Sequence, residues 1–205
     1  MTGNGKAPEA PAVVRRLEGA SQATLVDLVE TFEELQTVLR CCERLVAELA
    51  AETAPDGLLV EALWTVALLS YGRCFAVGEA GASLTEEDLT ATQLGGDVLE
   101  WHKVLLQLRD HHGDPVANPR ERYSVGVTQA ADGTASGVAI TSARQPLVDG
   151  LTVRQTGAIA YALSGLLNSR IEKQQETIFE ELKTTPRADL EKLDTLDLAQ
   201  PPAAE

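Results

Sequence analysis

The longest regular pattern of apolar residues begins just after Ser21. Apolar side chains recur there at alternating intervals of three and four positions, at Leu25, Leu28, Phe32, Leu35, Leu39, Cys42, Val46 and Leu49. This spacing predicts four heptads of a coiled-coil-type helix, about 32 residues long, with Ser21 as its N-cap and a stop at residues 54–57. Because Val29, Val38 and Leu45 widen the stripe, we expect this helix to pack against more than one neighbour.

A second helix is predicted from Leu58 to Phe75, in a run that is apolar on nearly all sides. Such a helix belongs in the middle of a bundle. Arg73 lies near its end, and a charged side chain inside a fold needs an opposite charge. We therefore expect Arg73 to be buried and paired with an acidic residue, the candidates being Glu61, Glu100 and Asp110.

Further helical segments follow along the chain. Residues 83–86 (Ser-Leu-Thr-Glu) fit a capping box for a short helix that ends near residues 95–96. A helix over residues 97–110 is indicated by an apolar stripe at Val98, Trp101, Leu105 and Leu108. A long helix is predicted over residues 152–183, and a short helical turn around residues 188–193.

Between these helices the apolar period changes to strict alternation. Apolar side chains occupy every second position on both sides of a turn signal at residues 131–134, at Tyr123, Val125, Val127, Val138 and Ile140. The pattern predicts a β-hairpin over about residues 121–143. Its apolar face is narrow, so we expect the hairpin to lie on the helices.

Together these elements predict a mainly α protein, a long-helix bundle with one inserted β-hairpin, over residues 21–193. Residues 1–20 and 194–205 are rich in small residues and proline, so both are predicted to be flexible tails. Each of the two long helices would span about 48 Å, which is more than a compact domain of this size needs. We expect their uncovered apolar surface to form the seam of a homodimer.

The net charge of the chain indicates which classes of partner it can bind. The 205 residues include 17 Lys and Arg against 31 Asp and Glu, a formal net charge of −14. Binding to nucleic acid through its phosphates needs clustered cations, and the sequence contains no basic cluster. A protein partner is therefore favoured over nucleic acid. The excess of Ala and Arg over Lys is typical of a bacterial protein from a GC-rich genome.

Nothing in the sequence indicates export or a membrane. Residues 1–16 lack the apolar stretch of a signal peptide, and the apolar run 58–75 contains charged side chains. The three cysteines, Cys41, Cys42 and Cys74, provide neither a disulfide framework nor a CxxC metal site. We expect a cytoplasmic protein without a cofactor.

Residue types that carry out catalysis concentrate at the end of the predicted helix 97–110, at His102, Arg109, Asp110, His111 and His112. His102 and Arg109 are seven residues apart and share a helix face. A proton-transfer site would use His102 or His112 as a base beside Arg109. A structural interpretation pairs Arg109 with Asp110 and leaves His111 and His112 in solvent at the helix end.

The same cluster contains metal-ligand types, at His102, His111, His112 and Asp114. Zinc sites on helices use ligands four residues apart or ligands fixed by a turn, whereas adjacent histidines point apart. The spacing therefore argues against a metal site, and no metal ligand is predicted.

The segment Leu108-Arg109-Asp110-His111-His112 resembles the Arg-[Asn/Asp]-x-x-x-x-His region of HEPN-type proteins, small helical domains that often dimerise and in many cases cleave RNA. The resemblance covers a short segment only. It implies that Arg109, with Asp110 as its polar neighbour, supports the scissile phosphate, and that a histidine acts on the ribose hydroxyl at a dimer cleft. The family's histidine would fall near residues 114–116, whereas His112 follows Arg109 by three positions.

Other catalytic signatures are absent from the sequence, including a glycine-rich phosphate loop, a serine nucleophile elbow and HExxH. We interpret the chain as a protein-interaction or assembly module without a catalytic site. The alternative is a HEPN-like RNA endonuclease, or a catalytically silent relative, centred on Arg109 and His112. A nuclease needs both side chains to converge on an open, positive cleft, whereas a module needs an exposed apolar or charge-complementary surface.

Overall fold

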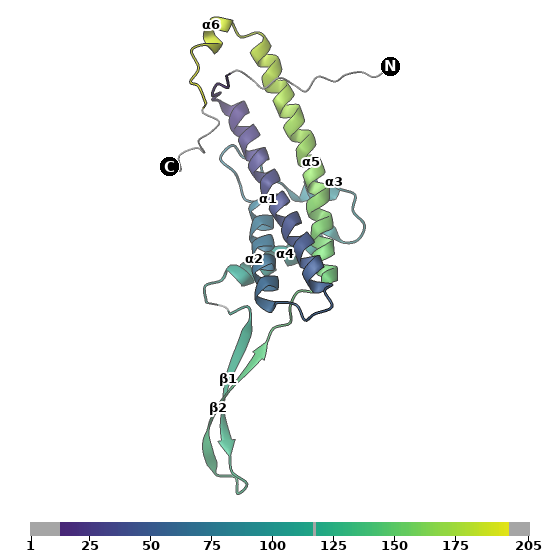
Figure 1. Cartoon of the computed structure of the whole chain (residues 1–205), viewed down its shortest axis with the longest axis vertical. Coiled ribbons are helices and arrows are strands. Elements are labelled where there is room, and N and C mark those ends of the chain that lie inside the picture. Colours follow the sequence, from purple (N-terminus) through teal and green to yellow (C-terminus); the bar gives the residue numbers. More distant parts are fainter. Residues whose placement is uncertain (1–12, 117, 197–205) are drawn as a thin grey trace.

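The protein is a mainly helical bundle from which one two-stranded hairpin projects (Figure 1). The computed structural model describes residues 13–116 and 118–196. The elements in chain order are α1 (Ala20–Leu49), α2 (Gly57–Arg73), α3 (Glu86–Ala91), α4 (Val98–Gly113), β1 (Glu121–Gln129), β2 (Ala135–Arg144), α5 (Gly150–Lys183) and α6 (Arg187–Leu190). The predicted fold class is therefore confirmed, with helix ends shifted by a few residues.

The long helices α1 and α5 pack along each other, and α2 packs on α1 as well (Figure 1). Of the apolar stripe predicted on α1, Leu28, Leu35 and Cys42 are buried and the other residues are partly buried. The flanking Val38 and Leu45 are completely inside. Helices of the same chain thus cover much of the stripe, and the homodimer seam that the heptad pattern suggested stays a prediction. The predicted N-cap is also wrong, since α1 begins after Gly19 and Ser21 lies within the helix.

The central helix α2 begins at Gly57, next to the predicted helix start at Leu58. The Asp56 carboxylate accepts hydrogen bonds from the backbone N–H groups of Leu58 and Leu59, which otherwise lack partners in the first turn. Val60, Leu68 and Tyr71 are essentially inaccessible to solvent. The helix therefore occupies the middle of the bundle, as its composition predicts.

The expectation of a buried Arg73 is wrong. Its side chain is 65% exposed and forms an ion pair with Glu34 of α1, with 3.2 Å between Nη1 and Oε1. Neither Glu61, Glu100 nor Asp110 is its partner. The reason is its position: Arg73 is the last residue of α2, where the helix reaches the surface beside α1.

The short helix α3 is fixed by two contacts of one buried carboxylate. Thr85 is the N-cap and Asp88 the N3 residue of a capping box, so the box lies two residues beyond the predicted one at Ser83. Asp88 also forms an ion pair with Arg170 of α5. This pair ties α3 to the long C-terminal helix.

A second buried carboxylate, Asp27 of α1, holds the loop that follows α2. Its Oδ2 accepts hydrogen bonds from the backbone N–H groups of Ala80 at 2.9 Å and Ala82 at 3.2 Å. Gly78 lies so close that a Cβ there would be 2.5 Å from Oδ2. The loop thus wraps the carboxylate with backbone donors, and Gly78 makes the close approach possible.

The hairpin is the element whose placement differs most from expectation. Strands β1 and β2 pair antiparallel, with Val125 opposite Ile140 and Val127 opposite Val138, and a turn containing Gly133 at φ 84°. The hairpin extends away from the end of the bundle instead of lying on the helices (Figure 1). Apart from Glu121 and Ala139, its side chains are exposed.

The first and last described segments of the chain contact each other. Arg15 and Thr195 form an isolated antiparallel bridge, the Arg16 N–H donates to the Asp194 carbonyl, and the Arg15 guanidinium donates to the Leu193 carbonyl at 2.6 Å. The described parts of the two expected flexible tails therefore bind one another. The remainder of both predicted tails, 1–12 and 197–205, lies outside the described residues, as does most of the segment on which the absence of a signal peptide was predicted.

Within the described ranges, no helix combines the length and the apolar composition that a bilayer crossing requires.

Candidate functional site

Helix α4 carries the predicted catalytic cluster, and it directs His102 into the core. His102 is 4% exposed, and 2.9 Å separates its Nδ1 from the Tyr71 hydroxyl oxygen of α2. The ring of Phe75 lies over the imidazole, with centroids 4.3 Å apart. Burial lowers the pKa of His102; Glu86 opposes this shift and Arg109 adds to it. The residue is a satisfied core histidine.

Arg109 and Asp110 form the local pair that the structural interpretation expects. The guanidinium donates from Nε at 2.9 Å and from Nη2 at 2.7 Å to the same carboxylate oxygen of Asp110. The Arg109 side chain crosses α2 at Gly72, where a Cβ would be 2.3 Å from Cδ. The contact holds the arginine stem against the central helix, with its charge already paired.

His112 contacts the same helix two turns away. Its Nδ1 lies 3.2 Å from the Thr65 hydroxyl oxygen, and its ring is half-buried, whereas His111 is exposed. Burial is the main cause that lowers the pKa of His112, the neighbouring His111 lowers it further and Glu61 opposes both. The expectation that both histidines lie in solvent is therefore correct for His111 and wrong for His112.

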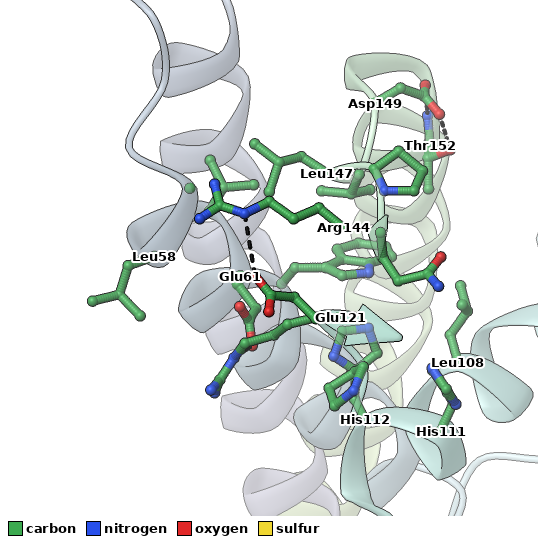
Figure 2. Close-up of a pocket in the computed structure, with 18 residues that line it drawn as sticks. Leu58, Glu61, Leu108, His111, His112, Glu121, Arg144, Leu147, Asp149 and Thr152 are labelled. Carbon is green, nitrogen blue, oxygen red and sulfur yellow. Dashed lines mark hydrogen bonds and ion pairs between the residues drawn. The ribbon is translucent and has the colours of Figure 1, made fainter. Parts of the chain in front are cut away.

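A cavity of about 650 Å³ opens beside His112, between α2, the end of α4, the base of the hairpin and the start of α5 (Figure 2). Its apolar wall is built by residues from the helices α2 and α4 and from the linkers before β1 and after β2: Gly57, Leu58, Val60, Trp64, Leu108, Pro119, Pro146, Leu147 and Val148. His111 and His112 lie at one edge (Figure 2). The described lining includes neither His102, Arg109 nor Asp110.

Two ion pairs border this cavity. Arg120 binds Glu61 of α2 through its Nε, which links the start of the hairpin to the bundle. Arg144 donates from Nε to Glu121 at 3.2 Å across the hairpin base. A hydrogen bond from Tyr123 is the main cause that lowers the pKa of Glu121, and Arg144 contributes to the shift.

Asp149 also lines the cavity, and its carboxylate caps the start of α5. Its carboxylate accepts hydrogen bonds from the backbone N–H groups of Leu151 and Thr152 and from the Thr152 hydroxyl. These bonds lower its pKa. Each acidic group at the cavity is thus engaged by a donor of this chain.

The described residues contain no cluster of three or more His, Cys, Asp or Glu that could hold a metal ion. The cysteines are buried, and burial raises the pKa of Cys42 and of Cys74 to about 12. A thiol that stays protonated at neutral pH is a poor nucleophile. Neither metal-assisted nor thiol chemistry is therefore indicated for this part of the chain.

A second surface with functional potential is the apolar face of the hairpin, which we call the arm face. It comprises side chains that alternate along both strands and point to the same side: Tyr123, Val125, Val127, Val138 and Ile140. These side chains are between 59% and 77% exposed. Glu121 and Arg144 lie on the same side at the base, so the arm face runs outward from the cavity.

Sequence reasoning identified His112 but missed the other cavity residues. Glu61, Trp64, Arg120, Arg144 and Leu147 come from segments far apart in the chain, and no spacing rule brings them together. The one available signal was the pair of arginines at 120 and 122 directly after the histidine cluster. Of these, Arg120 lines the cavity and Arg122 does not.

Comparison of the chain with models of protein families, with curated proteins and with solved structures finds no match. The resemblance of residues 108–112 to HEPN-type proteins stays a prediction, and no relative's activity bears on the roles of the residues described above.

Proposed function

We propose that the protein is an assembly module that binds a second copy of itself through the arm face. The observation that carries this proposal is the exposure of Val125 and Ile140, which face each other in the hairpin and are each 73% exposed. Contiguous exposed apolar side chains of this kind mark interaction sites. Burying a large one contributes about 1.5–3 kcal/mol.

The stability of the hairpin also supports a partner on the arm face. A two-stranded hairpin alone is marginally stable in water, and it becomes stable when its apolar face packs on another layer. The helices of this chain do not supply that layer, because the arm extends beyond the end of the bundle (Figure 1). A partner that packs on the arm face would supply it.

The distribution of charge favours a second copy as that partner. The chain has a formal charge of −14, so two bundle surfaces repel each other. The arm differs from the bundle, because residues 120–144 contain three arginines and two acidic residues. Its apolar face is uncharged between Tyr123 and the tip. Two identical faces related by a two-fold axis can therefore pack together without bringing like charges into contact.

More apolar surface lies at the same end of the bundle. Leu58, Leu147 and Leu151 are 71%, 43% and 60% exposed, at the start of α2 and around the start of α5. Leu151 lies outside the cavity lining, so a partner arm can contact it without entering the cavity. Leu151 enlarges the area available to a dimer beyond the hairpin.

The alternative, a HEPN-like endonuclease, has less support. Arg109 contacts α2 at Gly72 and His112 contacts it at Thr65, so the two side chains lie two helical turns apart on α2. Arg109 is also paired with Asp110. The arrangement favours a protein that assembles over one that cleaves RNA.

Sedimentation velocity at micromolar concentration tests the proposal with two matched variants. Val125→Glu places a charge on the arm face, and Ser124→Glu places the same charge on the opposite face of the same strand. We expect a dimer for the wild type and for Ser124→Glu, and a monomer for Val125→Glu. A wild-type monomer, or a dimer that survives in Val125→Glu, would contradict the proposal.

A further inference from the structure

We propose that the cavity at the base of the arm binds an uncharged, planar aromatic small molecule that carries a hydrogen-bonding group. This inference concerns a different surface from the arm face and does not depend on self-association. It rests on the size and wall of the cavity, on the pairing of the charges that line it, and on the position of His112 at its edge.

The cavity has the size and composition of a small-molecule site. Its volume of about 650 Å³ lies within the range of about 300–1,000 Å³ that is usual for such sites, whose walls are mainly apolar with a few placed polar groups. Trp64 is the aromatic residue of the lining. Leu108 and Leu147 contribute aliphatic wall (Figure 2). A flat ring system can pack against Trp64 and between these side chains.

The charges at the cavity favour a neutral ligand. Glu61 is paired with Arg120, Glu121 with Arg144, and Asp149 caps α5. An anionic ligand would have to compete with Glu61 and Glu121 for the arginines, and a cationic ligand would have to compete with the arginines for the carboxylates. An anion that drew the arginines away would leave the mostly buried carboxylates of Glu61 and Glu121 without their partners, at a cost. A cation would only exchange one solvent-screened contact for another, because the arginines are 64% and 87% exposed. An uncharged molecule disturbs neither pair.

His112 supplies the polar contact. Its Nδ1 is engaged by the Thr65 hydroxyl, so Nε2, on the other side of the ring, is the nitrogen left for a ligand. Burial lowers the pKa of this histidine and so favours the neutral ring. A hydroxyl group on the ligand can donate to or accept from a neutral imidazole, whichever tautomer is present.

Occupancy of the cavity would also fix the arm. One wall belongs to α2 and α4, and another belongs to the hairpin base through Arg120, Glu121 and Arg144. A ligand that contacts both walls binds best when the arm holds one orientation relative to the bundle. Ligand binding and arm position are therefore expected to be coupled.

Three probes that share one ring system test the inference on the full chain: 2-naphthol, 2-naphthoate and 2-naphthylmethylamine, which are neutral, anionic and cationic at pH 7.5. Equilibrium dialysis measures their binding. We expect saturable binding of 2-naphthol with one site per chain, and binding about tenfold weaker or less for both charged probes. Equal or tighter binding of a charged probe, or no saturable binding of 2-naphthol, would overturn the proposal.

Variants locate the binding in the cavity. Leu147→Trp places a large side chain at the rim of the cavity, where it fills the space. Val66→Trp is the control: it adds the same side chain on α2 outside the lining. The two positions are similarly exposed, Leu147 at 43% and Val66 at 45%. We expect Leu147→Trp to abolish 2-naphthol binding and Val66→Trp to leave it unchanged. Unchanged binding in Leu147→Trp with helical content intact by circular dichroism would overturn the site.

A third variant tests the polar contact. His112→Phe keeps a ring at the edge but removes the nitrogen, and we expect it to weaken binding about three- to tenfold. Binding by His112→Phe as tight as by the wild type would contradict the role of the imidazole. The Val125→Glu variant keeps the whole cavity lining and should still bind 2-naphthol saturably at one site per chain, so failure of ligand binding and failure of self-association can be read separately.

Discussion

Val125 lies directly opposite Ile140 in the hairpin, and each of the two side chains is 73% exposed. Cross-strand neighbours of this type stabilise a sheet when they are packed, typically by a few tenths of a kcal/mol to about 1 kcal/mol per pair. Here the pair has solvent on its outer side, at the middle of an arm that extends from the bundle (Figure 1). The arm face is thus apolar and exposed, and the helices of the same chain do not pack on it.

The loop around Asp27 gives a test of how the bundle is held together. Asp27→Ala leaves the backbone N–H groups of Ala80 and Ala82 without their acceptor, and such a loss costs about 1–3 kcal/mol. We expect a loss of this size in the free energy of unfolding, measured with urea, and faster hydrogen exchange in residues 78–82. Asp27→Asn, which keeps one acceptor oxygen, should lose less. Exchange in the loop that is unchanged in Asp27→Ala would show that the carboxylate does not hold it.

The pH dependence of stability follows from the buried His102. Its folded-state pKa lies below the unfolded value near 6.5, because burial disfavours the charged ring. Between the two pKa values the unfolded chain binds more protons, so stability rises with pH there and is lost as the pH falls below about 6.5. His112 contributes with the same sign.

We therefore expect the free energy of unfolding to fall between pH 7.5 and pH 5.5. His102→Gln should show a smaller fall than the wild type, and the same change at the exposed His111 serves as the control. Chemical unfolding at both pH values measures the difference. A fall of equal size in His102→Gln and the wild type would exclude His102 as its source.

A ribonuclease assay separates the two interpretations of the α4 cluster. We expect the purified protein to leave a structured RNA intact without added metal, because Arg109 is paired with Asp110 and the net charge of −14 opposes the approach of a polyanion. Cleavage by the wild type that disappears in both Arg109→Ala and His112→Ala would support the endonuclease instead.

The sequence predicts the helices and the turn of the hairpin because these depend on local patterns. The three-four spacing from Leu25 to Leu49 identifies α1, and strict alternation on both sides of Asp132-Gly133 identifies the hairpin. Gly133 adopts φ 84°, a conformation that glycine favours, so the turn residue also matches its position.

The placement of these elements could not be predicted in the same way. Alternation shows that a strand has an apolar face, but it does not say what covers that face, and the expectation that the hairpin lies on the helices was wrong for this reason. Arg73 was assigned to the interior from its apolar neighbours, although its position at the end of α2 brings it to Glu34 at the surface. The cavity could not be predicted either, because it depends on how the hairpin is placed on the bundle. Glu61 and Arg120 meet only after the hairpin base has packed beside α2.

Contact between two arm faces can be measured most directly with a single introduced cysteine. Ile140→Cys places a thiol at the middle of the arm face, where a two-fold axis along or across the arms brings identical residues together. Thr141→Cys places it on the opposite face of the same strand, at a position that is also exposed. The three natural cysteines are buried and should not compete. Under mild oxidation we predict a disulfide-linked dimer for Ile140→Cys and little for Thr141→Cys; equal cross-linking of the two variants, or none for Ile140→Cys, would contradict assembly through the arm face.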